Sequence, residues 1–132
     1  MKVFAAAMIA AALIATGCAE NTTKPASGVS NATGKSYPAH NRKIRIVKGD
    51  LPSGVTYEPI AEVKAIKGWY GELRDAEKEI ADNARAVGAD AIIREKAWHA
   101  PRAFTWAAPH AEGLAIKITG NVSLDGIPGD WL

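Results

Sequence analysis

The chain is poor in the residues that most often carry chemistry or hold a small domain together. It has one cysteine, Cys18, so no disulfide can form within the chain. Its formal net charge is only +2, and no run of Lys and Arg is longer than Arg42-Lys43, which argues against nucleic-acid binding. No glycine-rich phosphate loop, Ser/His/Asp order or paired-acid motif can be assembled. We therefore predict a protein that is not an enzyme and needs no cofactor.

The longest apolar run is too short for a permanent membrane span. Lys2 precedes twelve unbroken apolar residues, Val3 to Ile14, and the small residues Ala15-Thr16-Gly17 then lead to Cys18. This layout predicts a signal peptide over residues 1–17. It resembles the bacterial lipoprotein type, in which the cysteine is lipidated and becomes the first mature residue, although Ala15 stands where leucine is commonest. The alternative is an ordinary signal peptide followed by a chance cysteine.

A lipidated Cys18 would make the bilayer the first partner of this protein. Several acyl chains on one residue would hold it there almost permanently, because each buried methylene contributes about 0.8 kcal/mol. Ala19 follows the cysteine where an aspartate would be the usual inner-membrane retention signal, so the resemblance implies the outer membrane. Cleavage would remove Lys2 and lower the formal net charge from +2 to +1.

The mature chain divides into a polar segment and one domain. Residues 18–40 contain few large apolar side chains, only Val29 and Tyr37 after the cysteine, and we predict a flexible tether there. Residues 41–132 are of a size for a single domain.

The centre of that domain is predicted as strand, helix, strand over residues 57–97. The helix, Glu72 to Val87, has an apolar stripe at helical spacing and ends at Gly88, which suits the left-handed residue after a last helical turn. The preceding strand, Tyr57 to Lys67, is expected to turn Ala61, Val63 and Ala65 toward the helix. The following strand covers residues 90–97.

The remaining segments predict short strands and loops. Lys43 to Val47 alternates charged and apolar residues, as a strand with one solvated face does, and Gly113 to Thr119 alternates in the same way. Residues 98–112 contain two prolines and are expected to be a long connection, a hairpin with an irregular tip. Residues 121–132 are expected to fold back through Trp131. The fold class is therefore α+β, with one main helix on an antiparallel or mixed sheet of about four strands, covered on one face.

The order of these parts resembles a known family. A lipobox, a polar tether, a strand with Ile60-Ala61-Glu62-Val63, a helix, the run Gly88 to Ile93 and a closing Gly113 to Ile116 strand are similar to the RcsF-type stress-sensor lipoproteins of the outer membrane. The YbjQ-like group of small βαβ proteins shares the Gly-Ala-Asp-Ala signature. The resemblance implies an envelope protein that acts by protein contact in stress sensing or envelope maintenance. The disulfides of the RcsF type have no counterpart here, and no functional residue transfers by position.

Three histidines are the only neutral metal ligands in the sequence. His99 and His110 both lie in the predicted connection and are weak candidates to approach each other across it. Their spacing matches no established zinc pattern, and the alternative is that both are exposed loop residues. A small-ligand or metal-binding module, in the form of a YbjQ-like homo-oligomer, is the alternative function that they support.

The aromatic residues give the stronger signal. Phe104-Thr105-Trp106 lies between prolines with few charges nearby, and an aromatic loop tip is a common anchor for a partner surface. We predict that Phe104 and Trp106 contact an envelope protein partner. Trp69 and Trp98 are instead expected to close the ends of the small core.

Overall fold

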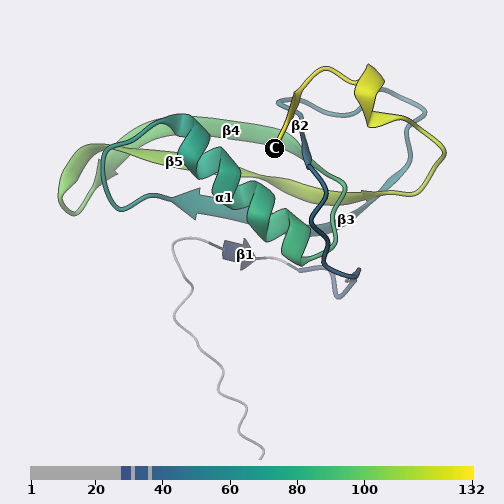
Figure 1. The fold of residues 1–132 in the computed structure, drawn as a ribbon, viewed down its shortest axis with the longest axis horizontal. Coiled ribbons are helices and arrows are strands. Elements are labelled where there is room, and N and C mark those ends of the chain that lie inside the picture. The colour runs from purple at the N-terminus through teal and green to yellow at the C-terminus, as the bar shows by residue number, and fades with distance from the viewer. Residues whose placement is uncertain (1–27, 31, 36) are drawn as a thin grey trace, which may run out of the picture.

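The computed structural model describes residues 28–30, 32–35 and 37–132, which form an α+β domain. One helix lies across one face of a mixed sheet (Figure 1). The elements in chain order are β1 (Gly28–Ser30), β2 (Arg45–Ile46), β3 (Tyr57–Ile66), α1 (Leu73–Ala86), β4 (Ala91–Arg102), β5 (Thr105–Ile118), the 3₁₀ helix η1 (Leu124–Gly126) and β6 (Asp130–Trp131).

The sheet is larger than the sequence predicts. Within the described residues it has six strands in the order β1-β3-β5-β4-β2-β6, whereas we expected about four. The additional strands are the short edge strands β1 and β6, of three and two residues. Such strands leave almost no periodic signal in a sequence, because alternation needs four or more residues to be recognisable. The predicted class, one helix on a mixed sheet, is confirmed.

The helix forms where the sequence has its apolar stripe, and the residues of that stripe are the ones that it buries. Ala76, Ile80, Ala81 and Ala84 are fully buried against the sheet. At the amino terminus the Glu72 N–H donates to the Asp75 carboxylate over 3.2 Å. At the carboxyl terminus the chain turns through Gly88, with φ of +75°. The N–H groups of Gly88 and Ala89 donate to Arg85 and Ala84, the hydrogen-bond pattern of a Schellman motif.

Gly88 also permits a close contact. A Cβ added to it would lie 2.6 Å from the backbone of Tyr37, which packs against the core. The helix stop thus depends on glycine for its backbone conformation and for its space.

The strand before the helix follows its predicted alternation. Ala61, Val63 and Ala65 are buried beneath α1, and Glu62 and Lys64 point to the other face. Pro59 lies at an irregularity in the pairing of β3 with β5, where a missing N–H is tolerated.

The hairpin predicted over residues 98–112 is confirmed, but the long irregular connection expected there is wrong. β4 continues to Arg102 and β5 begins at Thr105, so the two longest strands form one hairpin (Figure 1). Proline was the reason to expect a loop. Pro109 fits in β5 because β3 has already ended beside it, so its missing N–H interrupts no ladder, and its carbonyl accepts from the Lys67 N–H over 3.0 Å.

The sheet is covered on both faces at one end, where we expected cover on one face only. A second apolar cluster opposite the helix contains Val47, Ala91, Ile93, Ile116 and Ile127. The chain on both sides of η1 supplies part of this cover, and β6 then pairs with β2, which confirms that the carboxyl-terminal segment folds back.

This second cover explains why Arg45 is not on a solvated face. Its side chain is buried, its guanidinium lies 5.0 Å from the centroid of the Trp131 ring, and its Nε donates to the Ile127 carbonyl over 3.1 Å. The alternation of Lys43 to Val47 predicts the strand, but the solvated face is wrong.

The described chain before residue 41 packs on the domain, unlike the predicted tether. β1 pairs antiparallel with residues 62–64 of β3, and the Thr33 N–H donates to the Ile60 carbonyl over 2.9 Å. Backbone hydrogen bonds order this segment. Because such bonds do not need apolar side chains, the polar composition of the segment did not indicate that it would pack on the domain. The predicted signal peptide and Cys18 lie outside the described residues. Among the described ones, no helix is long and apolar enough to cross a membrane.

Candidate functional site

Exposed aromatic side chains gather at one end of the molecule. Phe104 and Trp106 are each 83% exposed, Trp69 is 61% exposed and Tyr70 is 52% exposed. We call these four residues the aromatic tip. Phe104 lies in the turn of the β4–β5 hairpin and Trp106 at the start of β5, while Trp69 and Tyr70 lie in the loop between β3 and α1. They make up most of the large apolar side chains that the described residues expose, the others being Val29 and Val122.

The aromatic tip is held in place by contacts between its two segments. The Trp69 and Tyr70 rings meet edge to face with centroids 5.6 Å apart. The Trp106 N–H lies 3.4 Å from the Tyr70 hydroxyl and donates to it. Arg102, in β4, donates to the Ile66 carbonyl over 2.8 Å and so fixes the end of β3 against the hairpin. The exposed rings are therefore presented on braced backbone.

The structure corrects the expectation for two tryptophans. Trp69 is exposed and closes no core. Trp98 is half-buried and stacks on the His110 ring, with centroids 5.3 Å apart and an interplanar angle of 25°.

The two candidate metal histidines do not converge. His110 pairs with Trp98 across the strands and His99 pairs with Pro109, so the two imidazoles leave opposite faces of the hairpin. A ring nitrogen of His99, Nε2, lies 3.0 Å from the Gly71 carbonyl. Burial and the charge of Lys64 lower the pKa of His110. In the part of the chain that the structure describes, no three His, Cys, Asp or Glu side chains are placed to hold a metal ion.

A β-bulge in β4 is the feature that sequence reasoning missed. Arg94 and Glu95 together oppose Gly113 of β5, and Arg94 has a φ of +52°, the left-handed region that side chains rarely adopt. A Cβ on Gly113 would lie 2.3 Å from Ile92 Cγ2, so glycine alone fits opposite the bulge. The Arg94 and Glu95 N–H groups donate to the carbonyls of Gly49 and Val47. The one available signal was three successive charges, Arg94-Glu95-Lys96, within a predicted strand.

The bulge reverses which side chains of β4 face the helix. Ile92 and Ala97 both belong to the core under α1, although five residues apart they would leave opposite faces of a regular strand. The extra residue turns Glu95 inward, where it is 3% exposed and neither carboxylate oxygen has a hydrogen-bond partner. Burial, together with the Glu77 carboxylate on α1, raises the pKa of Glu95 to about 7.

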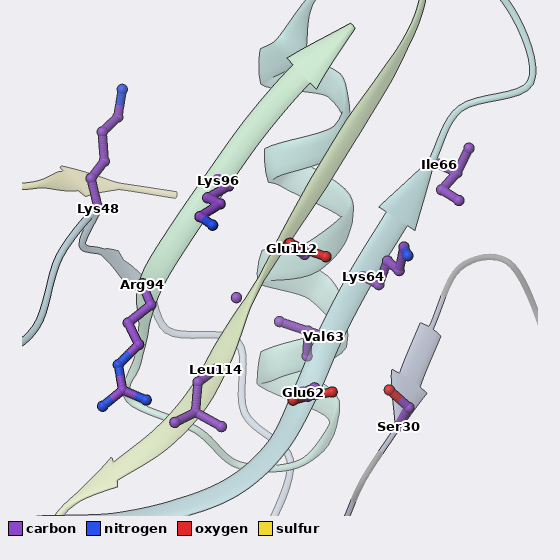
Figure 2. Close-up of a pocket in the computed structure, with 11 residues that line it drawn as sticks. Ser30, Lys48, Glu62, Val63, Lys64, Ile66, Arg94, Lys96, Glu112 and Leu114 are labelled. Carbon is purple, nitrogen blue, oxygen red and sulfur yellow. The ribbon is translucent and has the colours of Figure 1, made fainter. Parts of the chain in front are cut away.

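On the other side of the sheet lies an open groove of about 790 Å³. Its floor is the uncovered face of β3, β5 and β4, beside the second apolar cluster. Figure 2 shows the groove from the side opposite α1, with charged side chains projecting from all three strands. The charged lining residues are Lys48, Lys64, Arg94, Lys96, Glu62 and Glu112.

Comparison of the chain with family models, with curated proteins and with solved structures finds no match. Any function proposed here depends on the geometry of the aromatic tip, the bulge and the groove, together with the sequence features of the amino terminus.

Proposed function

We propose that this chain is a non-enzymatic envelope lipoprotein, anchored in the outer membrane through acylated Cys18, that works by protein–protein contact. Stress sensing or envelope maintenance of the RcsF type is the role that its sequence resemblance favours. The observation that carries the proposal is the exposure of Phe104 and Trp106, 83% each, on a braced hairpin.

The exposure of these rings supports contact for an energetic reason. A large aromatic side chain in water forgoes roughly 1.5–3 kcal/mol that burial would contribute. The aromatic tip repeats this exposure at four neighbouring positions, while smaller apolar residues fill the core. Aromatic residues dominate the affinity of protein interfaces, where truncation of a central ring commonly costs 2 kcal/mol or more. The aromatic tip is thus suited to fill pockets on a partner.

The test is photo-crosslinking in cells. A photoreactive phenylalanine analogue placed singly at Phe104 or Trp106 is expected to give a protein adduct that mass spectrometry identifies. The matched control is the same analogue at Val122, which is 38% exposed and follows the far end of β5. Equal adducts from position 122, or adducts with lipid alone from positions 104 and 106, would overturn the contact proposal.

The anchor needs its own measurement. Intact-mass analysis of the protein extracted from membranes is expected to show a chain that begins at Cys18 and carries acyl groups. The Cys18→Ala variant is expected to leave the membrane fraction. An unmodified, soluble wild-type product would contradict the anchor while leaving the crosslinking result to stand by itself.

A further inference from the structure

The open groove on the sheet has the charge and form of an anion site. Four cationic side chains line it against two carboxylates. Lys48, Lys64 and Lys96 make no ion pair within 4.0 Å among the described residues, and Arg94 pairs only with the exposed Asp50. A volume of about 790 Å³ is in the range of small-molecule sites.

The strand register places two lysines symmetrically. Lys64 of β3 and Lys96 of β4 both lie opposite Glu112 of the central strand β5. Adjacent strands are about 4.8 Å apart, so the two lysine backbones are roughly 10 Å apart with Glu112 between them. Both ammonium groups can reach a ligand centred above Glu112, while its carboxylate limits how strongly a single small anion is held.

The bulge adds the third cation at a structural cost. In a regular strand Arg94 would face the helix, and the bulge instead turns it to the groove side of the sheet, where Figure 2 shows it at the edge of β4 with its guanidinium pointing away from Lys96. The cost is a left-handed backbone at Arg94 and a buried, unpartnered carboxyl at Glu95. Departures of this kind are expected where they serve function, and both of these bring Arg94 to the groove side of the sheet. Arginine binds phosphate through two parallel hydrogen bonds.

We propose that this groove binds a ligand that carries two or more phosphate groups, with one phosphate between Lys64 and Lys96 and another at Arg94. The source is either a free phosphorylated small molecule or the headgroups of anionic lipids, since both present the same oxygens. The Ser30 hydroxyl, on β1 at the rim, is placed to donate a further hydrogen bond. This site is separate from the aromatic tip and does not depend on the contact function.

The experiment uses the full chain in a neutral detergent with two probes. Inorganic pyrophosphate is titrated by calorimetry, and vesicles of neutral lipid, with or without an anionic phospholipid, are tested by co-sedimentation. The Lys64→Gln/Lys96→Gln variant is expected to weaken binding of the responding probe by about tenfold or more, because it removes two charge-assisted hydrogen bonds. Glu112→Gln is expected to strengthen it a few-fold by removing repulsion.

The matched control is Lys43→Gln/Lys78→Gln, which removes the same charge from exposed positions outside the groove. If pyrophosphate binds, and its binding is weakened by Lys64→Gln/Lys96→Gln but not by the control pair, the ligand is a free phosphorylated molecule. If the chain binds vesicles only when they contain anionic lipid, and the variants change that binding in the same way, the ligand is the headgroup of an anionic lipid. The proposal is overturned if neither probe binds, if the control pair weakens binding equally, or if Glu112→Gln weakens it. All three groove positions are exposed or half-buried, so their variants are expected to fold.

Discussion

The two ends of the β4–β5 hairpin differ in what covers them. At the end near Ile92 and Ile93 the sheet is covered by α1 on one face and by the chain around η1 on the other, and Ile92, Ile93 and Ile116 are fully buried there. At the turn, nothing among the described residues covers Phe104 and Trp106. The same hairpin thus serves as core at one end and as surface at the other, which separates the residues that fold the domain from those available for contact.

The largest expected effect tests that separation directly. Ile80→Ala removes a fully buried side chain of α1 and is expected to lower the free energy of unfolding by about 2–5 kcal/mol. Phe104→Ala/Trp106→Ala should change it by less than about 0.5 kcal/mol, because both rings are exposed. Urea unfolding followed by circular dichroism measures both values. A loss of stability in the double variant similar to that of Ile80→Ala would mean that the aromatic tip is part of the core.

An intermediate effect is expected at Glu95, which lies between the covered and open regions of β4. Its pKa is about 7 in the folded state against an ordinary value of 4.5, so between these two values the folded chain holds a proton that the unfolded chain has released. Folded-state stability should therefore fall as pH rises through this window, by roughly 3 kcal/mol at most from this group.

The groups that act on Glu95 are Glu77 and Asp130, which oppose its ionisation, and Lys48, which favours it. Glu95→Gln stays neutral, and at pH 8 it should be more stable than the wild type by about 1–3 kcal/mol, with the advantage vanishing near pH 5. Denaturant unfolding at several pH values measures the difference between the two proteins. An advantage that is constant across pH would show that Glu95 titrates normally.

The smallest effect is expected from the brace of the aromatic tip. Arg102→Ala removes the hydrogen bond to the Ile66 carbonyl, which is exposed, and should cost no more than about 1 kcal/mol of global stability. It should nevertheless speed amide exchange at Lys67, whose N–H donates to Pro109 beside that bond. Unchanged exchange would show that the tip is held by its rings alone. A matched variant, Arg74→Ala on the helix, should leave the Lys67 amide as it is.

Periodicity explains which parts of this fold could be read from the sequence. Ala76, Ile80 and Ala84 repeat at helical spacing over roughly two turns, and Ala61, Val63 and Ala65 alternate over several residues, so α1 and β3 were predictable. The prolines at 101 and 109 concealed the length of the two hairpin strands, because a proline is compatible with a strand only where no neighbouring strand needs its N–H, and that depends on tertiary structure.

Some parts of the candidate site could likewise be predicted from the sequence, and others could not. The exposure of Phe104 and Trp106 agrees with their predicted place at a turn between prolines. Trp69 was expected in the core because a single residue carries no period to show whether it faces protein or water. The bulge and the groove could not be predicted at all. They arise from pairing between Arg94 and a glycine nineteen positions later, and no local pattern specifies that register.

The short ladder of β1 has a mechanical consequence. Among the described residues, tension on the amino-terminal side of the chain would act on the three paired residues of β1 before it acted on the hydrophobic core. Those few hydrogen bonds would rupture at a far lower force than the interior packing withstands, and the break would withdraw Ser30 from the groove wall. A pull on the amino-terminal side would thus alter the shape of a binding surface while the body of the protein stays folded.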